Sequence, residues 1–552
     1  MLIRPKLSTM TASAEQAPFP TRQLFVLALC RISEPIAFMS IFPYIYFMVK
    51  HFDITKDEGL ISMYAGMVTS AFAFAEFSTG VLWGRLSDRV GRKPILLTGL
   101  AGTGLSMIVF GFAPNFPVAV VARALGGLLN GNIGVLQTTV AEVVTVESHQ
   151  PCAYSIMPFV WCLGSIIGSG LGGTLAEPVK NYPTIFQPGG VFEQYPFLLP
   201  NLVCTFVVIC GLIIGFLFLE ETHEDFKMRR DLGCETGRWL LVKLLRVRGD
   251  SPREKVGYFE ETLNLIAEDD EQPPGYQSTE SSPRLSCTTP RAQAASKKCP
   301  EKSHLTRQTS IWQAFTRQVA LNIIAYGILA FHTISFEQLF PVMLSTPDSD
   351  VPPSLPFKFL GGFNFSAKTV GIILSAQGIV QMMVQIFVFP VVTRRFGSLA
   401  TFRSVILLYP FLHFVTPYLS LLPSEIRMAG VYVIVAWKVT AQSLAFPSNN
   451  IMINNAAPSK KSLGLLNGVA ASAASLSRAF GPTVSGAVQS VGVDLGCAGL
   501  AWWVCSLIAA VGAMESLWMR ETKRQPTGVQ FDDVDVETSL PERLCDSLDS
   551  PS

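Results

Sequence analysis

The chain has 552 residues, of which 49% are hydrophobic and only 15% charged, and its mean hydropathy is +0.38. This composition excludes an ordinary soluble protein of this size and favours a membrane protein. The formal net charge of +1 offers no basic surface for nucleic acid. The eleven cysteines include no CxxC pair, so we expect small core residues and predict neither a metal site nor a disulfide framework.

Apolar runs long enough to cross a bilayer occur in two sets of six. A transmembrane helix needs roughly 20 apolar residues to cross about 30 Å of hydrocarbon. Such runs occupy 23–49, 61–83, 94–113, 117–139, 153–176 and 197–219, and then 318–344, 369–392, 402–421, 428–447, 463–490 and 497–519. They predict an all-α polytopic membrane protein with twelve transmembrane helices in two pseudo-symmetric six-helix bundles, at 23–219 and 318–519.

Polar segments precede, separate and follow the two bundles. Residues 1–22 predict an N-terminal tail, and the first apolar run is too long and too late for a cleaved signal peptide, which favours a retained signal anchor. Residues 220–317 are rich in Ser, Thr, Pro, Glu and Lys, and predict a disordered linker in which 239–248 could form a short amphipathic helix. Residues 520–552 form an acidic tail.

Basic residues in short loops predict the orientation. The loops on the side of the N-terminus carry many more Lys and Arg residues than those on the other side, so the positive-inside rule predicts that both termini and the linker are cytoplasmic. The sequon at Asn364 would then lie outside as a possible glycosylation site, although a chance tripeptide explains it as simply.

The same short sequences recur at an offset near 300 residues. PhePro stands at 42–43 and 340–341, an Arg-x-Gly ends at Gly91 and at Gly397, and GluThr stands at 221–222 and 521–522. Several matches in the same order indicate that a six-helix unit has been duplicated.

The loop between the second and third runs reads GRLSDRVGRK. It resembles the signature loop of the major facilitator superfamily, G-x-L-x-D-R-x-G-R-K, at every specified position. The resemblance implies a gating loop in which glycines permit a tight turn and the charged side chains stabilise one conformation. The alternative is a basic loop that only sets the orientation of the chain in the membrane. This alternative suits the second half, where Pro390 stands at the position of Gly84 and Arg394 at that of Asp88. The implied gating residues are Gly84, Asp88, Arg89, Gly91, Arg92 and Lys93.

Small residues in the fifth and eleventh runs indicate close helix packing. The fifth run resembles the glycine motif of proton-coupled antiporters, G-x-x-x-G-P-x-x-G-G, with Ser169 in place of the proline, and this favours export over import; ordinary packing of small residues is the alternative. The predicted packing residues are Gly164, Gly168, Gly172 and Gly173 in the fifth run, and the corresponding Gly481 and Pro482 in the eleventh run.

Charged residues within the apolar runs are costly against lipid, so we expect them to face a cavity or each other. Arg31 and Glu34 share a helix face, and the PhePro register places His332 opposite Glu34. Arg123 resembles the family's fourth-helix arginine, which is implicated in proton transfer; alternatively, its side chain extends to the membrane interface. Each of the other charged residues could instead form an ion pair that only stabilises helix packing. The candidate proton or substrate residues are Arg31, Glu34, Glu76, Arg123, His332, Glu337, Lys438 and Arg478.

The resemblance covers about 21–520. ArgIleSerGluProIle in the first run and GluGluThrHis after the sixth resemble the fungal multidrug and zinc-induced-facilitator-like branch most closely. It implies a monomeric transporter of the plasma or vacuolar membrane that exports small molecules by alternating access. A proton gradient would supply the energy, without a cofactor. No P-loop, HExxH or GxSxG motif supports an enzyme. A proton-driven importer and a non-transporting nutrient sensor remain the alternatives.

Overall fold

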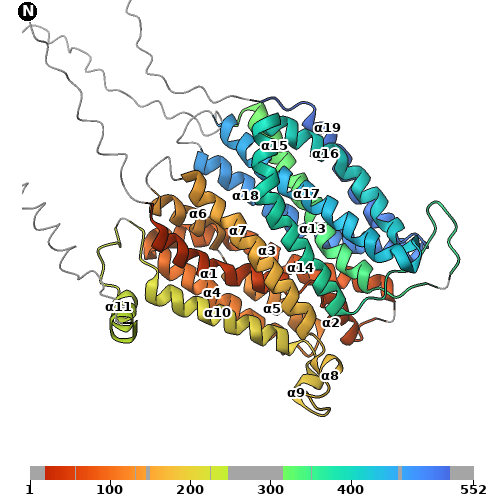
Figure 1. Ribbon diagram of the computed structural model, residues 1–552, viewed down its shortest axis with the longest axis horizontal. Coiled ribbons are helices and arrows are strands. Elements are labelled where there is room, and N and C mark those ends of the chain that lie inside the picture. Colours follow the sequence, from red (N-terminus) through yellow and green to blue (C-terminus); the bar gives the residue numbers. More distant parts are fainter. Residues whose placement is uncertain are drawn as a thin grey trace, which may run out of the picture.

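The computed structural model describes residues 19–55, 57–130, 132–144, 150–223, 225–245, 315–349, 351–457 and 463–521. Figure 1 shows two groups of helices side by side, the first running from α1 to α10 and the second from α13 to α19. The first group consists of α1 (Thr21–Met39), α2 (Ile45–His51), α3 (Glu58–Val90), α4 (Arg92–Gly111), α5 (Phe116–Leu129), α6 (Asn132–Val143), α7 (Gln150–Leu175), α8 (Pro178–Asn181), α9 (Val191–Gln194) and α10 (Leu198–Phe218). The second consists of α13 (Arg317–Ser345), α14 (Ala367–Met383), η3 (Val384–Val388), α15 (Phe389–Phe396), α16 (Ser398–Val415), η4 (Thr416–Leu421), α17 (Ser424–Ala456), α18 (Leu463–Asp494) and α19 (Leu500–Ser516). A further helix, α11 (Leu232–Leu245), packs against the end of α10, outside the two bundles.

These helices confirm the predicted all-α fold class. Within the described ranges, nine helical segments are long and apolar enough to cross a membrane. The remaining predicted runs correspond to α1 with α2, to α18 and to α19. Parts of the predicted N-terminal tail (1–22), linker (220–317) and acidic tail (520–552) lie outside the described residues, including 1–18, 246–314 and 522–552. The described part of the linker contains α11, at Leu232–Leu245 where a short helix at 239–248 was predicted.

Two of the predicted runs contain a break that the sequence analysis did not separate. The first run divides between α1 and α2 at Phe42 and Pro43, and the fourth divides between α5 and α6 at Asn130. The duplicated PhePro behaves differently in the second half, where α13 continues through Pro341. Proline removes one backbone donor and either breaks or bends a helix, so the same dipeptide has produced both outcomes.

The two halves meet at one end of the bundle and separate at the other. We call the end where α10 leads into α11 the linker end, and the end that carries α8 and α9 the far end (Figure 1). From the far end to mid-depth, α3 packs on α18 and α7 packs on α14. Three hydrogen bonds cross between the halves there, from Gln338 Nε2 to the Ser62 carbonyl (3.1 Å), from the Thr483 amide to Ser70 Oγ (3.2 Å) and from Ser375 Oγ to the Ile166 carbonyl (3.0 Å).

At the linker end the corresponding helices face open space. Gly80 and Gly84 of α3 and Gly468 of α18 have no neighbouring atom within 4 Å of a side-chain position. The structure therefore represents a conformation in which the halves are closed at the far end and open at the linker end.

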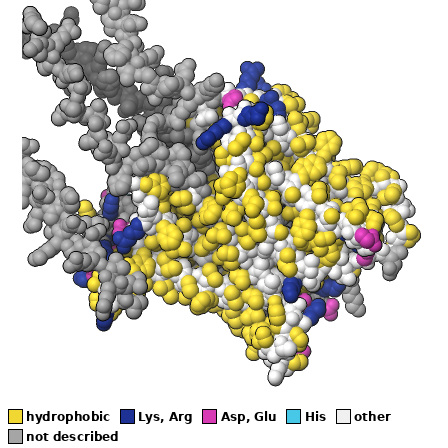
Figure 2. Space-filling model, viewed as in Figure 1, with side chains coloured by type: hydrophobic (Ala, Val, Ile, Leu, Met, Phe, Trp, Pro, Cys, Tyr) yellow, Lys and Arg dark blue, Asp and Glu magenta, His cyan; other side chains and the backbone are white. Residues whose placement is uncertain are grey.

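The outer surface is apolar over its middle and charged at its ends. Figure 2 shows hydrophobic side chains spread across the visible face, with Lys, Arg, Asp and Glu gathered toward both extremities. Exposed large hydrophobic residues on α10 and α14, such as Phe206 and Ile372, belong to this belt. A bilayer would cover it, which agrees with the predicted multi-pass membrane protein.

Candidate functional site

The predicted gating loop is a tight turn between α3 and α4. Gly91 joins the two helices with φ 110°, a conformation that strongly favours glycine. Arg92, the first residue of α4, donates from Nη1 to Ser87 Oγ and to Asp88 Oδ1 (both 2.6 Å) and pairs with Glu142 of α6 at 3.0 Å. The Asp88 side chain is 62% exposed and bonds within its own loop. Asp88 therefore pairs within its own half in this conformation.

A carboxylate that the sequence analysis did not assign closes the start of α4. Glu221 accepts hydrogen bonds from the backbone amides of Arg92 (2.8 Å) and Lys93 (3.1 Å), so it caps amides that have no partner inside the helix. In the second half, Glu521 lies beside Gly397 and accepts from Ser398 Oγ at 3.4 Å, at the start of α16. The repeated Glu of GluThr thus has the same position in both halves, at the start of the third helix.

Lys93 turns away from the rest of the loop. Its Nζ lies 2.6 Å from Asp231 Oδ2 and donates to the Phe216 carbonyl at 2.9 Å, near the last turn of α10. The side chain is buried, so this lysine connects the gating loop to the segment that precedes α11.

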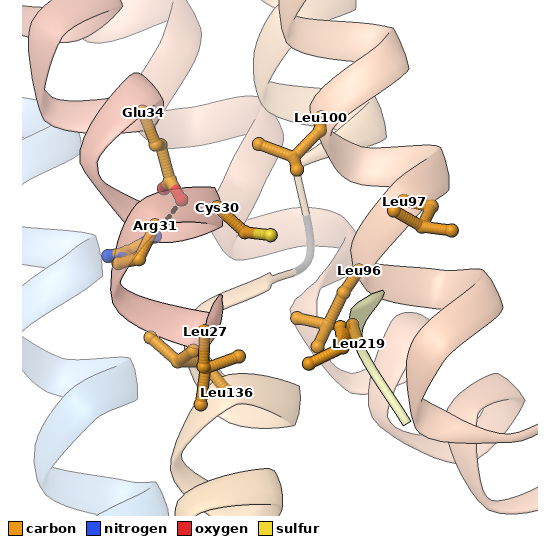
Figure 3. Close-up of a pocket in the computed structure, with 9 residues that line it drawn as sticks. All are labelled: Leu27, Cys30, Arg31, Glu34, Leu96, Leu97, Leu100, Leu136 and Leu219. Carbon is orange, nitrogen blue, oxygen red and sulfur yellow. Dashed lines mark ion pairs between the residues drawn. The ribbon is translucent and has the colours of Figure 1, made fainter. Parts of the chain in front are cut away.

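In the first half, Glu34 is held by two partners. It forms an ion pair with Arg31 one turn earlier on α1, and its Oε1 accepts from Asn130 Nδ2 at the break between α5 and α6 (2.8 Å). Figure 3 shows the Arg31 and Glu34 side chains pointing toward one another beside a leucine-rich cavity of about 20 Å³, which has room for roughly one water molecule. Asn130 was not predicted as a partner, and its position at a helix break is what brings it to Glu34.

Arg123 and Glu76 form the centre of a second group of charges. Arg123 is only 4% exposed and its guanidinium lies over the rings of Phe72 (4.6 Å) and Phe38 (5.7 Å). It does not snorkel to an interface, so that alternative is wrong; the faces of the two aromatic rings attract the cation. Glu76 interacts electrostatically with Arg478 of α18 and with Arg31 and Arg123 of its own half.

In the second half, an ion pair joins α13 to α17. Glu337 pairs with Lys438, which is only 1% exposed, and it also accepts from Gln377 Nε2 of α14 at 3.0 and 3.2 Å. Three helices are therefore tied together by one carboxylate.

His332 has a partner that the sequence analysis missed. Its Nδ1 lies 3.2 Å from Nε2 of His413 on α16, and the ring of Tyr409 packs against it with centroids 4.6 Å apart. No hydrogen bond or ion pair between His332 and Glu34 is present among the described residues; each belongs to the network of its own half. His413 lies in the apolar run 402–421, where an ionisable residue is itself a signal of a functional site, but its pairing with His332 could not be inferred from the sequence.

The predicted packing glycines lie at close helix contacts. Gly164 and Gly168 pack on the proline ring and backbone of α1, and Gly172 packs on the backbone of Ser40, which follows that helix. Gly173 meets Gly371 of α14 across the two halves, with a Cβ at Gly173 only 2.6 Å from the Gly371 Cα. Gly481 packs on α13, whereas Pro482 packs on Gly66 of α3 across the halves. Asn364 is exposed in the loop before α14 at the far end, and its glycosylation stays a prediction.

Two helix bundles around buried charges, closed at one end and open at the other, define a polytopic transporter that works by alternating access. The family model of the Major Facilitator Superfamily matches residues 27–348, and the chain belongs to that family. This confirms the resemblance that the loop motif indicated.

The relatives agree with this assignment. The chain is 53% identical to the major facilitator superfamily multidrug transporter mfsB of Aspergillus fumigatus, over 95% of this chain and 88% of the relative. It is 26% identical to the protein Zinc induced facilitator-like 1 of Arabidopsis thaliana, over 86% and 84% of the two chains.

Solved structures show the same fold at low sequence identity. The human organic anion transporter MFSD10 matches with a TM-score of 0.54 and 17% identity, over 91% of this chain and all of the other. A D-xylose–proton symporter matches with a TM-score of 0.58 and 12% identity, over 92% of this chain and all of the other.

Proposed function

We propose that this transporter exports small organic molecules from the cytoplasm in exchange for protons. Its relative from Aspergillus fumigatus is named a multidrug transporter. All four glycines of the antiporter motif are present in this chain, and only the motif proline is replaced, by Ser169. The excess of basic residues in the loops of the linker end supports a cytoplasmic location for that end. The present conformation would then be open to the cytoplasm and ready to load substrate.

The placement of Glu76 carries the coupling mechanism. When Glu76 is ionised, it attracts Arg478 in the other half while compensating Arg31 and Arg123 in its own. When it binds a proton, the guanidinium groups on the two sides lose this shared counter-charge and repel each other. A proton on Glu76 therefore biases how the halves approach, which is the differential interaction that alternating access requires.

Other buried carboxylates have more complete partnerships. Glu34 already has Arg31 and Asn130, and Glu337 has Lys438 and Gln377. We infer that these two networks mainly hold the helices of each half together, while Glu76 responds to the proton gradient.

The test uses purified protein in liposomes with an imposed pH gradient. Fluorescent cationic, neutral and anionic organic compounds are loaded on the side of the linker end, and their flux is recorded with and without the gradient. We expect gradient-driven export for the wild type and flux without coupling for Glu76→Gln, because this side chain has nearly the same shape and cannot ionise. Glu425→Gln, an exposed residue at the start of α17, is the matched control and should remain coupled.

The alternatives give different results in the same assay. Uptake toward the linker end, driven by the gradient, would indicate a proton-driven importer. Absence of flux for every compound, in protein that is folded by its melting curve, would favour a non-transporting sensor and would contradict the proposal. Coupled transport by Glu76→Gln would refute the role of Glu76 alone.

A further inference from the structure

We infer that α11 is an interfacial helix that binds the surface of a bilayer leaflet rich in anionic headgroups. The inference goes beyond the transport reaction, because it concerns a surface outside the two helix bundles and a partner that is neither substrate nor proton.

The position of α11 suits a helix that lies along the bilayer surface. In Figure 1 the helices α1, α4 and α10 extend across the view, whereas α11 is strongly foreshortened beside the linker end of α10. Its axis therefore crosses the direction of the transmembrane helices. A helix with this direction at the end of a transmembrane bundle lies in the plane of the interface.

Close backbone contacts fix α11 to the end of α10. Gly233 and Gly237, one turn apart, face the carbonyl groups of Phe216 and Leu217, and a Cβ at either glycine would collide with those carbonyl oxygens. The thiol of Cys234 donates to the Leu219 carbonyl at 3.2 Å and is buried, although the residue lies within 220–317, for which a disordered linker was predicted. The helix is thus docked through one face.

The start of α11 is attached to the gating loop. Asp231 accepts from the amides of Gly233 (2.9 Å) and Cys234 (3.2 Å), which caps the helix, and it pairs with Lys93 at 2.6 Å. Burial opposes ionisation here, but the hydrogen bonds from Lys93 and Cys234 prevail and lower the pKa of the Asp231 carboxyl. A contact that fixes the position of α11 therefore also fixes the position of the Lys93 side chain, through its pair with Asp231.

The face of α11 that points away from α10 combines apolar and basic side chains. Leu232, Trp239 and Val242 are 64%, 58% and 52% exposed, and Lys243 Nζ lies 4.6 Å from the centroid of the Trp239 ring. Arg238, which is half-buried at the edge of this face and interacts electrostatically with Glu235, adds a second cation. Exposed tryptophan beside basic residues is the composition of protein segments that sit at headgroup level.

The charges of the segment explain why the headgroups should be anionic. Its acidic residues are already engaged, Asp231 with Lys93 and Glu235 with Arg230 at 2.9 Å. Arg238 and Lys243 then present positive charge next to the apolar side chains. Each cation near an anionic surface strengthens binding by about fivefold, so the pair predicts roughly a 30-fold preference for anionic over neutral surfaces.

The test measures which lipid touches Trp239 in the full-length protein. The protein is placed in nanodiscs that hold equal amounts of phosphatidylserine and phosphatidylcholine, with bromine on the tails of one lipid or of the other. The contribution of Trp239 is the difference in fluorescence between the wild type and Trp239→Phe. The buried Trp502, measured in the same way through Trp502→Phe, is the control that no lipid should quench.

We expect Trp239 to be quenched more strongly by brominated phosphatidylserine than by brominated phosphatidylcholine, and to be protected from acrylamide in water. In the double variant Arg238→Gln/Lys243→Gln the difference between the two lipids should disappear. Equal quenching by both lipids in the wild type would refute the preference for anionic headgroups. Protection of Trp239 from acrylamide without quenching by either lipid would show that another part of the chain covers α11. Quenching of Trp239 by acrylamide would show that this face of α11 points to water. Either result would overturn the inference.

Discussion

Replacing Gly371 by valine should shift the transporter toward the conformation that is closed at the linker end. A Cβ atom at Gly371 would lie 2.7 Å from the Cα of Gly173 and 2.8 Å from the carbonyl oxygen of Ser169. Ordinary contacts between carbon atoms are about 3.5–4.0 Å, and backbone atoms cannot rotate away. Overpacking of this kind costs about 1–3 kcal/mol. The cost applies only while the far end is closed, so it changes the ratio of the two conformations by about 5- to 150-fold.

Hydrogen exchange measured by mass spectrometry reports this change without a label. In Gly371→Val we expect faster exchange at the far end of α3 and α18, in residues 59–66 and 482–493, and slower exchange in residues 78–86 at the linker end of α3. The matched control is Gly134→Val, since Gly134 lies on α6 with no atom within 4 Å of a side-chain position. An exchange pattern for Gly371→Val that matches both the wild type and the control would refute the reasoning.

Three other changes test the contacts around the loop and the second half. Removing the cap in Glu221→Ala should cost about 0.5–2 kcal/mol, seen as a lower melting temperature and faster exchange in the first turn of α4; Glu221→Gln, which still offers an acceptor oxygen, should lose less. Lys438→Met leaves the Glu337 carboxylate buried without its cation and should lower the free energy of unfolding by about 3–5 kcal/mol. The double variant Lys438→Met/Glu337→Gln should recover much of the melting temperature. A double variant no more stable than the single one would contradict the pairing. Because the pKa of Asp231 is lowered below its ordinary value of 3.8, the stability that it contributes is present above that value and is lost only as the pH falls through the lowered pKa. Exchange in α11, corrected for the intrinsic rate, should therefore stay constant between about pH 5 and 8, and release within that range would show that Lys93 does not hold Asp231.

Most of the fold followed from the lengths of apolar runs, because a bilayer demands a nearly fixed number of apolar residues for each crossing. The breaks did not follow in the same way. Asn130 begins an Asn-Gly dipeptide, which is common in turns, but it stands inside an apolar run long enough for one continuous helix, and the run was predicted as one. The chain interrupts the helix there and directs the Asn130 amide to Glu34. That partner lies 96 residues earlier in the chain, which no local pattern reveals.

The candidate site could be predicted where the interacting residues are close together in the sequence, and not where they are far apart. The pair of Arg31 and Glu34 could be inferred from spacing on one helix. Glu221 and Glu142 could not be assigned, because their partner Arg92 is far away in the sequence. The repeat did mark Glu221 as a duplicated position, and only the structure shows that the position caps a helix.

The meeting of Gly173 with Gly371 has a consequence for the speed of the transport cycle. Where two helices touch through bare backbone, closing the contact freezes no rotamers and opening it releases none, so the step carries almost no side-chain entropy in either direction. A gate of this kind at the far end would close in the same way whichever substrate had just left. A transporter that serves chemically diverse cargo would benefit from a closing step that is indifferent to their shapes.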